Sequence, residues 1–235
     1  MNKNDVMKEL EAFGDERTKN TYMNHGAREP FFGVKAGDLK KILKKTKTNH
    51  ELSLELYATG NSDAMYLACL MADANQITEA QLDQWADQAY WYYLFDYAVP
   101  WVAGDTAFGF EIGLKWIESD QERIASAGWS ALASFASVNP DEKLDIEAYR
   151  RLLKRAQDNI HSAPNRTRFS MNGFVIAVGG YIESLTKDAL EAGAKIGKVD
   201  VTLGSAACKV PLATEYVQKV IDKDRVGKKR KTARC

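Results

Sequence analysis

Residues 120–136 read DQERIASAGWSALASFA, an apolar helical pattern in which most side chains are small. Apolar residues recur three and four positions apart, which is the spacing of one helix face. Small side chains reduce the distance at which two helices pack. Two further stretches, DAMYLACLMADA (63–74) and RTRFSMNGFVIAVGGYIE (166–183), have the same character. The three segments are unevenly spaced, so the sequence predicts irregular helical repeats rather than a strict array.

Helical periodicity continues along nearly the whole chain and predicts an all-α fold. More than ten successive helices favour a bundle or a curved superhelical stack. Only residues 197–210 differ, because Val199, Val201 and Leu203 alternate with polar residues. This alternation predicts one short β segment near 198–210. The expected helices cover approximately residues 6–13, 15–25, 37–46, 51–59, 62–74, 78–89, 91–102, 107–118, 120–138, 143–160, 166–183, 187–196 and 211–223. Thr78 and Gln81 have the spacing of a capping box at the start of one of them.

Composition favours an ordinary globular protein of the cytoplasm. Of the 235 residues, 45% are hydrophobic and 27% are charged, which suits a sizeable core. The sequence contains no apolar run long enough to span a membrane, and residues 1–14 do not resemble a signal peptide. Three widely spaced cysteines, Cys69, Cys208 and Cys235, argue against a disulfide framework.

Positive charge is concentrated at the C-terminus although the formal net charge is zero. From Lys223 onward there are seven basic residues and one acidic residue, a net charge of +6, which leaves −6 on the first 222 residues. We therefore expect one folded domain over residues 1–225 and a flexible basic tail over 226–235. A neutral protein can still bind nucleic acid when its cations are gathered in one place.

Three basic clusters are candidate phosphate-binding sites. The alternative for each is a solvated helix face, but three clusters together favour DNA. We expect the first two to face one concavity. They comprise Lys35, Lys40, Lys41, Lys44 and Lys45; then Arg150, Arg151, Lys154, Arg155, Arg166 and Arg168; then Lys228, Lys229, Arg230 and Lys231.

Asp96 lies in an aromatic stretch, QWADQAYWYYLFDYAVPWV (residues 84–102), whose only other acid is Asp87. Most of these rings are expected in the core. Asp96 lies four residues after Tyr92, hence one turn away on the same helical face. A carboxylate beside aromatic rings can stabilise a cationic transition state. The alternative is that Asp96 caps or hydrogen-bonds a neighbouring helix, and spacing alone leaves both interpretations open.

Sequence motifs for other chemistries are missing. The three histidines lack metal-ligand spacing, and neither a dinucleotide-binding motif nor a P-loop occurs. We therefore expect no metal and no cofactor. A Ser–His–Asp or Cys–His arrangement has no nucleophile-elbow motif to support it.

Three segments together resemble the AlkD-like DNA alkylation repair proteins: TYMNHGAREPFFGVKAGDLKKILKK (21–45), the aromatic stretch ending in FDYAVP (95–100), and the helix after WIESD (116–120). The similarity weakens after about residue 190. The resemblance implies a curved stack of HEAT-like helix pairs whose concave, positive surface holds duplex DNA. It also implies a DNA glycosylase that releases cationic N3- and N7-alkylated purines, with Asp96 as the catalytic carboxylate and Tyr92 in place of a neighbouring Trp.

Two residues of the family's active surface are not found in this sequence. The family's DNA-contacting Arg falls near Ser126, and a second cleft Trp falls near Ile176. Neither Ser nor Ile replaces a guanidinium or an indole. The chain is therefore similar to the AlkF/AlkG-type branch, associated with branched DNA rather than base excision.

Three functions are compatible with these observations. The favoured one is a monomeric DNA-binding protein of the cytoplasm, associated with the nucleoid, that binds duplex or branched DNA with weak or no base excision. The alternative is an active alkylpurine DNA glycosylase. A protein-interaction scaffold is a third, because helical repeats often serve that purpose.

Overall fold

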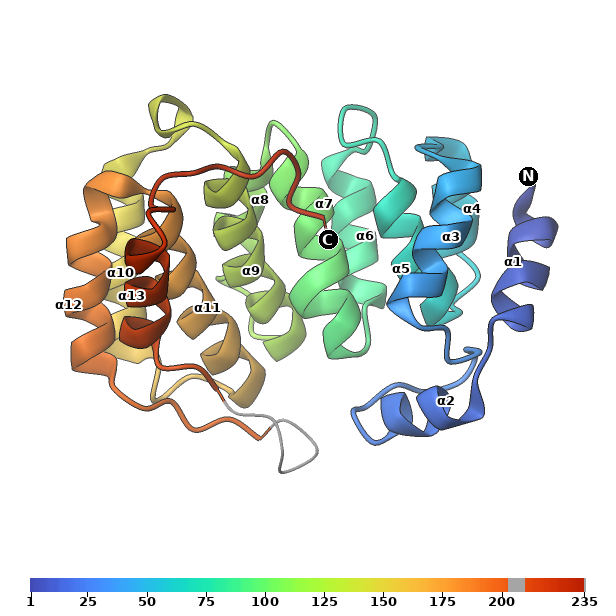
Figure 1. Cartoon of the computed structure of the whole chain (residues 1–235), viewed down its shortest axis with the longest axis horizontal. Helices are drawn as coiled ribbons and strands as arrows, with labels where there is room; N and C mark the ends of the chain where they lie inside the picture. Colours follow the sequence, from blue (N-terminus) through green and yellow to red (C-terminus); the bar gives the residue numbers. More distant parts are fainter. Residues whose placement is uncertain (203–209, 235) are drawn as a thin grey trace.

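The computed structural model of the protein describes residues 1–202 and 210–234, which form helices and loops without a strand. The helices follow one another along the long axis in chain order (Figure 1), which confirms the predicted all-α stack. The first half contains α1 (Lys3–Ala12), α2 (Glu16–Met23), α3 (Ala36–Thr46), α4 (His50–Tyr57), α5 (Ser62–Met71), α6 (Glu79–Gln88), the π-helix η1 (Tyr93–Ala98) and α7 (Val99–Asp105). The second half contains α8 (Gly109–Trp116), α9 (Glu122–Val138), the 3-10 helix η2 (Asp141–Lys143), α10 (Ile146–Asn159), α11 (Asn165–Tyr181), the 3-10 helix η3 (Glu183–Leu185), α12 (Thr186–Ile196) and α13 (Ala213–Asp222).

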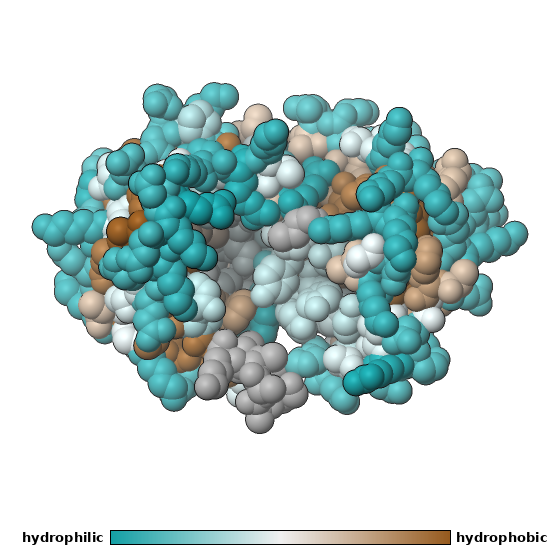
Figure 2. All heavy atoms as spheres, in the orientation of Figure 1, coloured by the Kyte–Doolittle hydropathy of each residue, from teal (hydrophilic) through white to brown (hydrophobic). Residues whose placement is uncertain are grey.

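The stack has two rows of helices. In the row nearer the viewer of Figure 1, α3, α5, α7, α9 and α11 pack successively on one another. The helices α4, α6, α8 and α10 pack behind this row, α12 lies at the left end of the stack against α10 and α11, and α13 packs against α11 and α12. Figure 2 shows the front of the molecule hollowed at its centre with hydrophilic side chains around the rim. We call the surface formed by α3, α5, η1, α7, α9, α11 and α13 the inner face.

Close packing around α9 joins the two halves of the core. Its Ala127 and Ala131 belong to the core of the first half, while Trp129 and Leu132 belong to that of the second. A Cβ atom at Gly128 would lie 2.6 Å from the backbone nitrogen of Ile117, which no side chain tolerates without a backbone shift. The small residues of this helix therefore allow the helices on either side to approach it closely.

Local capping explains several helix starts. Thr78 accepts a hydrogen bond from the Gln81 backbone, and Gln81 accepts one from Thr78, which confirms the capping box expected there. Asp63 is buried on α5 and accepts hydrogen bonds from the backbone nitrogens of residues 32, 33 and 34, at 2.6–3.1 Å. This carboxylate fixes the loop that precedes the lysine-rich helix α3.

The aromatic segment differs from the expected single α-helix. Residues 93–98 form a π-helix that passes directly into α7. A π-helix inserts an extra residue into the turn, so it rotates the side chains that follow relative to an α-helix, and such turns are frequent at functional sites. Helical periodicity alone did not predict this change. The β segment expected near 198–210 is not formed at residues 198–202 and 210, and residues 203–209 lie outside the described part of the chain.

The C-terminal segment also differs from the expected flexible tail. Residues 226–234 run back across the molecule from α13 toward α7 (Figure 1). Asp105, at the end of α7, accepts hydrogen bonds from the Thr232 hydroxyl and the Ala233 nitrogen, both at 2.7 Å. The Arg234 guanidinium lies 3.1 Å from the same carboxylate and also donates to the carbonyl oxygens of Leu70 and Ala72. Specific partners thus hold a segment that charge alone suggested to be free.

None of the helices in residues 1–202 and 210–234 is long and apolar enough to cross a membrane.

We predict that the Asp105 contacts stabilise the fold. Asp105→Ala leaves the largely buried Arg234 guanidinium without its counter-charge, so the free energy of unfolding should fall by about 2–4 kcal/mol in urea titrations. Lys231→Ala removes an exposed cation of the same segment and should change it by about 0.5 kcal/mol or less. Equal, small effects of the two substitutions would show that the segment contributes nothing to stability.

Candidate functional site

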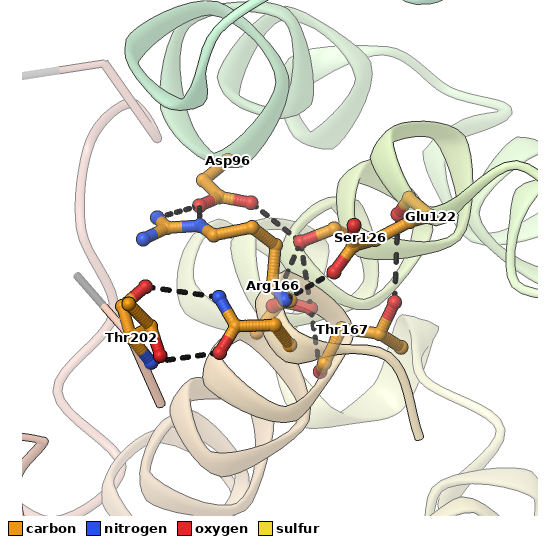
Figure 3. A network of polar contacts seen from close by, with 8 residues as sticks. Asp96, Glu122, Ser126, Arg166, Thr167 and Thr202 are labelled. Carbon is orange, nitrogen blue, oxygen red and sulfur yellow. Dashed lines mark hydrogen bonds and ion pairs between the residues drawn. The ribbon is translucent and has the colours of Figure 1, made fainter. Parts of the chain in front are cut away.

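Asp96 is enclosed by an ion pair at the centre of the inner row. Its side chain is 1% exposed, and its Oδ2 atom accepts hydrogen bonds from Nε (2.9 Å) and Nη2 of Arg166. The other carboxylate oxygen accepts a 2.5 Å hydrogen bond from the Ser126 hydroxyl. These three side chains come from η1, α11 and α9 and point toward one another in Figure 3. Both oxygens of Asp96 are therefore occupied by groups of the protein itself.

Arg166 is held from several sides at the start of α11. Its backbone nitrogen donates a 2.6 Å hydrogen bond to Glu122 on α9 (Figure 3). Its guanidinium carbon lies 4.7 Å from the ring centroids of both Tyr92 and Phe169. A cation above aromatic faces is attracted by the ring quadrupole, particularly where water is excluded. The Arg166 guanidinium therefore contacts two aromatic rings while it pairs with the Asp96 carboxylate and covers it.

The electrostatics of Asp96 combine opposing effects. Burial removes water from the carboxylate and raises the pKa of Asp96 to about 6, while the Arg166 guanidinium and the Ser126 hydroxyl lower it. The neighbouring Glu122 carboxylate adds to the rise. Burial also raises the pKa of the Tyr92 phenol well above its usual value. Neither group is poised as a free anion on the surface.

A pocket of about 190 Å³ adjoins this cluster, but Asp96 does not line it. Arg166, Tyr92 and Phe95 form part of its wall together with residues 25, 26, 90, 91 and 202. A ligand in the pocket would meet the guanidinium and the aromatic rings before it reached the carboxylate. The arrangement suits the binding of an anion or a planar group, and stabilisation of a sugar cation by Asp96 requires Arg166 to move first.

Tyr92 and Asp96 are joined through Arg166, and both come from the segment at η1 in the inner row. Asp96 is buried below the surface, however, so the structure also realises the alternative in which it bonds to neighbouring helices. Ser126, the position where the resemblance places an Arg, binds the carboxylate, and the guanidinium comes instead from α11. Ile176 is half-buried on the same helix.

The basic clusters fall on different sides of the stack. The lysines of the first cluster lie on α3 in the inner row, except Lys35, which directly precedes it; Lys41 pairs with Asp38 and Lys45 with Glu9. Lys35 lies 3.9 Å from Asp15, whereas Lys40 and Lys44 are exposed and form no ion pair with a described residue.

The cations of α10 do not share a surface with those of α3. The helix α10 lies in the rear row (Figure 1) and buries Leu152 and Leu153. Its cations Arg150 and Arg155 pair with carboxylates of the neighbouring α12 and of the segment after α8, so they do not reach the inner face. Three of its cations are also paired with carboxylates: Arg150 with Glu147 and Asp188, Lys154 with Asp158, and Arg155 with Glu118. The expectation of one shared concavity is wrong for Arg150, Arg151, Lys154 and Arg155, while Arg166 and Arg168 lie on α11 in the inner row.

In the C-terminal cluster, Lys229 is mostly covered and pairs with Asp141 at 2.8 Å, and Lys228 lies 3.4 Å from Asp224. Arg230 is half-buried and its backbone nitrogen donates to the Ser137 carbonyl. Lys231 is exposed. Packing therefore removes part of this cluster from direct contact with a ligand.

Sequence reasoning singled out Ser126 only as the position where the resemblance places an Arg, and it did not identify Ser126, Glu122 or Phe169 as members of the site. Phe169 was one apolar residue in α11. No spacing rule connects side chains that come from η1, α9 and α11, because the packing of these helices determines which side chains contact one another.

Among residues 1–202 and 210–234, no group of three or more His, Cys, Asp or Glu side chains could hold a metal ion.

Comparisons with known proteins show which family and fold the chain is similar to. A model of the family described as DNA alkylation repair enzyme matches residues 6–215. Uncharacterized proteins of Listeria innocua and Listeria monocytogenes are each 38% identical over 218 residues, covering 90% of this chain and 93% of theirs. A solved structure with a TM-score of 0.90 and 40% identity covers all of both chains. It is described as a new family of proteins related to the HEAT-like repeat DNA glycosylases with affinity for branched DNA structures.

We predict that replacing Arg166 lowers the free energy of unfolding, because the buried Asp96 carboxylate loses its counter-charge. In Arg166→Met, desolvation of Asp96 is no longer opposed by Arg166, so its native pKa rises further above the ordinary value of 3.8. A native state with a raised pKa binds the proton more tightly than the unfolded chain does. The loss of unfolding free energy is therefore largest above the native pKa and shrinks as the pH falls toward 3.8.

The expected loss is about 3–5 kcal/mol near pH 8 and distinctly smaller near pH 5, measured by urea titration. Arg155→Met is the matched control, because Arg155 forms an exposed pair with Glu118 and should contribute about 1 kcal/mol or less. A loss that does not change with pH would show that Arg166 acts by packing and not through the Asp96 charge.

Proposed function

Because the chain belongs to the DNA alkylation repair enzyme family, we propose that it is a DNA-binding protein that prefers branched DNA and excises alkylated bases weakly or not at all. Within the family we assign it to the AlkF/AlkG-type branch. The folded unit for this function comprises residues 1–225 with the C-terminal segment packed on it. We propose that it acts as a monomer, in the cytoplasm and in association with the nucleoid.

The enclosed Asp96 carboxylate is the observation that carries this proposal. A glycosylase needs its anion beside the sugar, where positive charge develops as the bond to the base breaks. Here both carboxylate oxygens accept hydrogen bonds from protein side chains, and the counter-charge is already supplied by Arg166. An anion neutralised in this way contributes little further stabilisation to a sugar cation.

The inner face offers the charge that DNA binding requires. Lys40 and Lys44 are exposed on α3 at one end, and Arg166 lies at the pocket in the middle. The arms of a branched DNA present several phosphate backbones at once, so a hollowed surface with separated cations makes more contacts with a junction than with a linear duplex. The affinity for branched DNA described for the similar solved structure supports the same preference.

Base excision is the alternative function, favoured by the pocket that places Tyr92 and Arg166 above Asp96. In that case a bound cationic base would displace Arg166 and uncover the carboxylate. The alternative differs from the proposal in one measurable property, namely base release that depends on Asp96.

We predict little release of N7-methylguanine or N3-methyladenine from methylated duplex DNA, measured by chromatography of the freed bases. Removal of one well-placed electrostatic stabiliser costs about two to three orders of magnitude in rate. The protein should retard a three-way or four-way junction more strongly than a linear duplex of equal length. Asp96→Asn should leave junction binding intact. Robust excision that Asp96→Asn abolishes would establish the glycosylase and refute the proposal.

The salt dependence of junction binding should identify the surface used. Lys40→Gln with Lys44→Gln removes two unpaired cations of the inner row. The slope of log affinity against log salt should then flatten by about 0.9 for each duplex phosphate that the protein no longer neutralises. Arg151→Gln with Lys154→Gln removes the same charge from α10 and should leave the slope unchanged. The reverse result would place DNA on the rear row.

A further inference from the structure

A second pocket opens on the inner face between α11 and α13, away from the Asp96 cluster. Its volume is about 410 Å³, within the range of small-molecule sites. The floor comes from Gly173, Ile176, Ala177 and Gly180, whose spacing of three and four residues forms one stripe along α11. Arg166 precedes Gly173 by about two turns and so lies on the same stripe. The pocket therefore continues the surface that carries the guanidinium.

The glycines keep the floor flat and open. A Cβ atom at Gly173 would have no heavy atom within 4 Å, and Gly173 is exposed. A Cβ atom at Gly180 would meet only the Val220 side chain, at 3.6 Å. Packing between helices thus does not require glycine at these two positions, in contrast to Gly128 on α9. The floor offers apolar area on which a planar group can lie.

Aromatic rings and cations surround this floor. Tyr181 and Tyr216 line the pocket, and Tyr216 is 45% exposed, one of the few large side chains left so open. The Nζ atom of Lys219 lies 4.5 Å from the Tyr216 ring centroid. The remaining cations of the rim are Lys223, Arg225 and Lys228, and no carboxylate is among the described residues that line the pocket.

These cations are largely available to a ligand. Lys219, Lys223 and Arg225 are exposed and form no ion pair with any residue in 1–202 or 210–234, whereas Lys228 lies 3.4 Å from Asp224. The chain turns back at Gly227, whose nitrogen donates a 3.0 Å hydrogen bond to the Gly180 carbonyl, and this bond fixes Lys228 beside the pocket. Positive charge is therefore gathered at the edge of an apolar, aromatic cavity.

We propose that this pocket takes one unpaired nucleotide at the branch point of a bound DNA. The base would lie on the glycine-rich floor against Tyr216, and its flanking phosphates would contact Lys219, Lys223 and Arg225. Bases stack on aromatic side chains whatever their sequence, and phosphates require cations at the edge of such a platform. The inference rests on the proposed function, because the nucleotide belongs to the branched DNA held on the inner face.

Two three-way junctions of equal arm length and sequence provide the test, one fully paired and one with two unpaired adenines at the branch point. The wild-type protein should bind the second about tenfold more tightly, in the range of one base stacked on an aromatic ring. Gly173→Phe fills the open floor and should equalise the two affinities. Gly173→Ala is the matched control, since it leaves most of the floor open, and it should preserve the tenfold difference.

Tyr216→Ala provides a second variant, because this exposed ring contributes little to the fold, and it should also remove the preference while Tyr216→Phe retains it. A polyglutamate peptide should compete poorly, since it lacks a planar group, and strong competition would show that charge alone fills the pocket. Equal binding of both junctions by the wild type would overturn the pocket proposal and leave the proposed function standing. Absence of binding to either junction would overturn the proposed function itself.

Discussion

The close approach of neighbouring helices to α9 is the constraint on which both the fold and the site depend. A side chain at position 128 would meet the backbone of Ile117, the residue that directly follows α8. Helices α8 and α9 therefore lie as close together as their main chains permit. Helix α9 also packs against η1, α7 and α11, and it carries Ser126 between them. Because the side chains of α9 are small here, the carboxylate of Asp96 and the guanidinium of Arg166 can meet beside Ser126. A larger residue at Ser126 would occupy the space in which they pair.

That meeting changes what a carboxylate in the aromatic stretch can do. An exposed Asp beside electron-rich rings would stabilise a neighbouring cation, which is how sequence spacing suggested a catalytic role. In the structure the cation is supplied by the protein, and Tyr92 and Phe169 stack on the guanidinium that closes the site. The arrangement turns the guanidinium of a neutralised ion pair toward the pocket, where a glycosylase would present a carboxylate. Residues suited to catalysis are thereby combined into a surface suited to phosphate.

Much of the fold could be predicted from the sequence, and much of the site could not. Periodicity located the helices, and local rules gave the Thr78–Gln81 cap, because both depend on residues a few positions apart. The partnership of Asp96 with Arg166 spans 70 positions and depends on how η1, α9 and α11 pack. The π-helix likewise has no periodic signal of its own. Counting charges was misleading for α10 and for residues 226–234, because a count does not show which carboxylates pair with these cations in the folded protein.

Along one side of α11, the inner face changes from a closed part at Arg166 to an open part at Gly173. At the start of α11, Arg166 is fixed by a carboxylate, a hydroxyl network and two rings, so its geometry is set before any ligand arrives. Two turns later, Gly173 leaves an open floor bordered by Lys219, Lys223 and Arg225, which form no ion pair with any described residue. A pre-formed cation suits a phosphate in a constant position, since no ordering is needed on binding. An open, glycine-lined floor suits a group whose position varies, such as a base released from pairing where DNA arms separate.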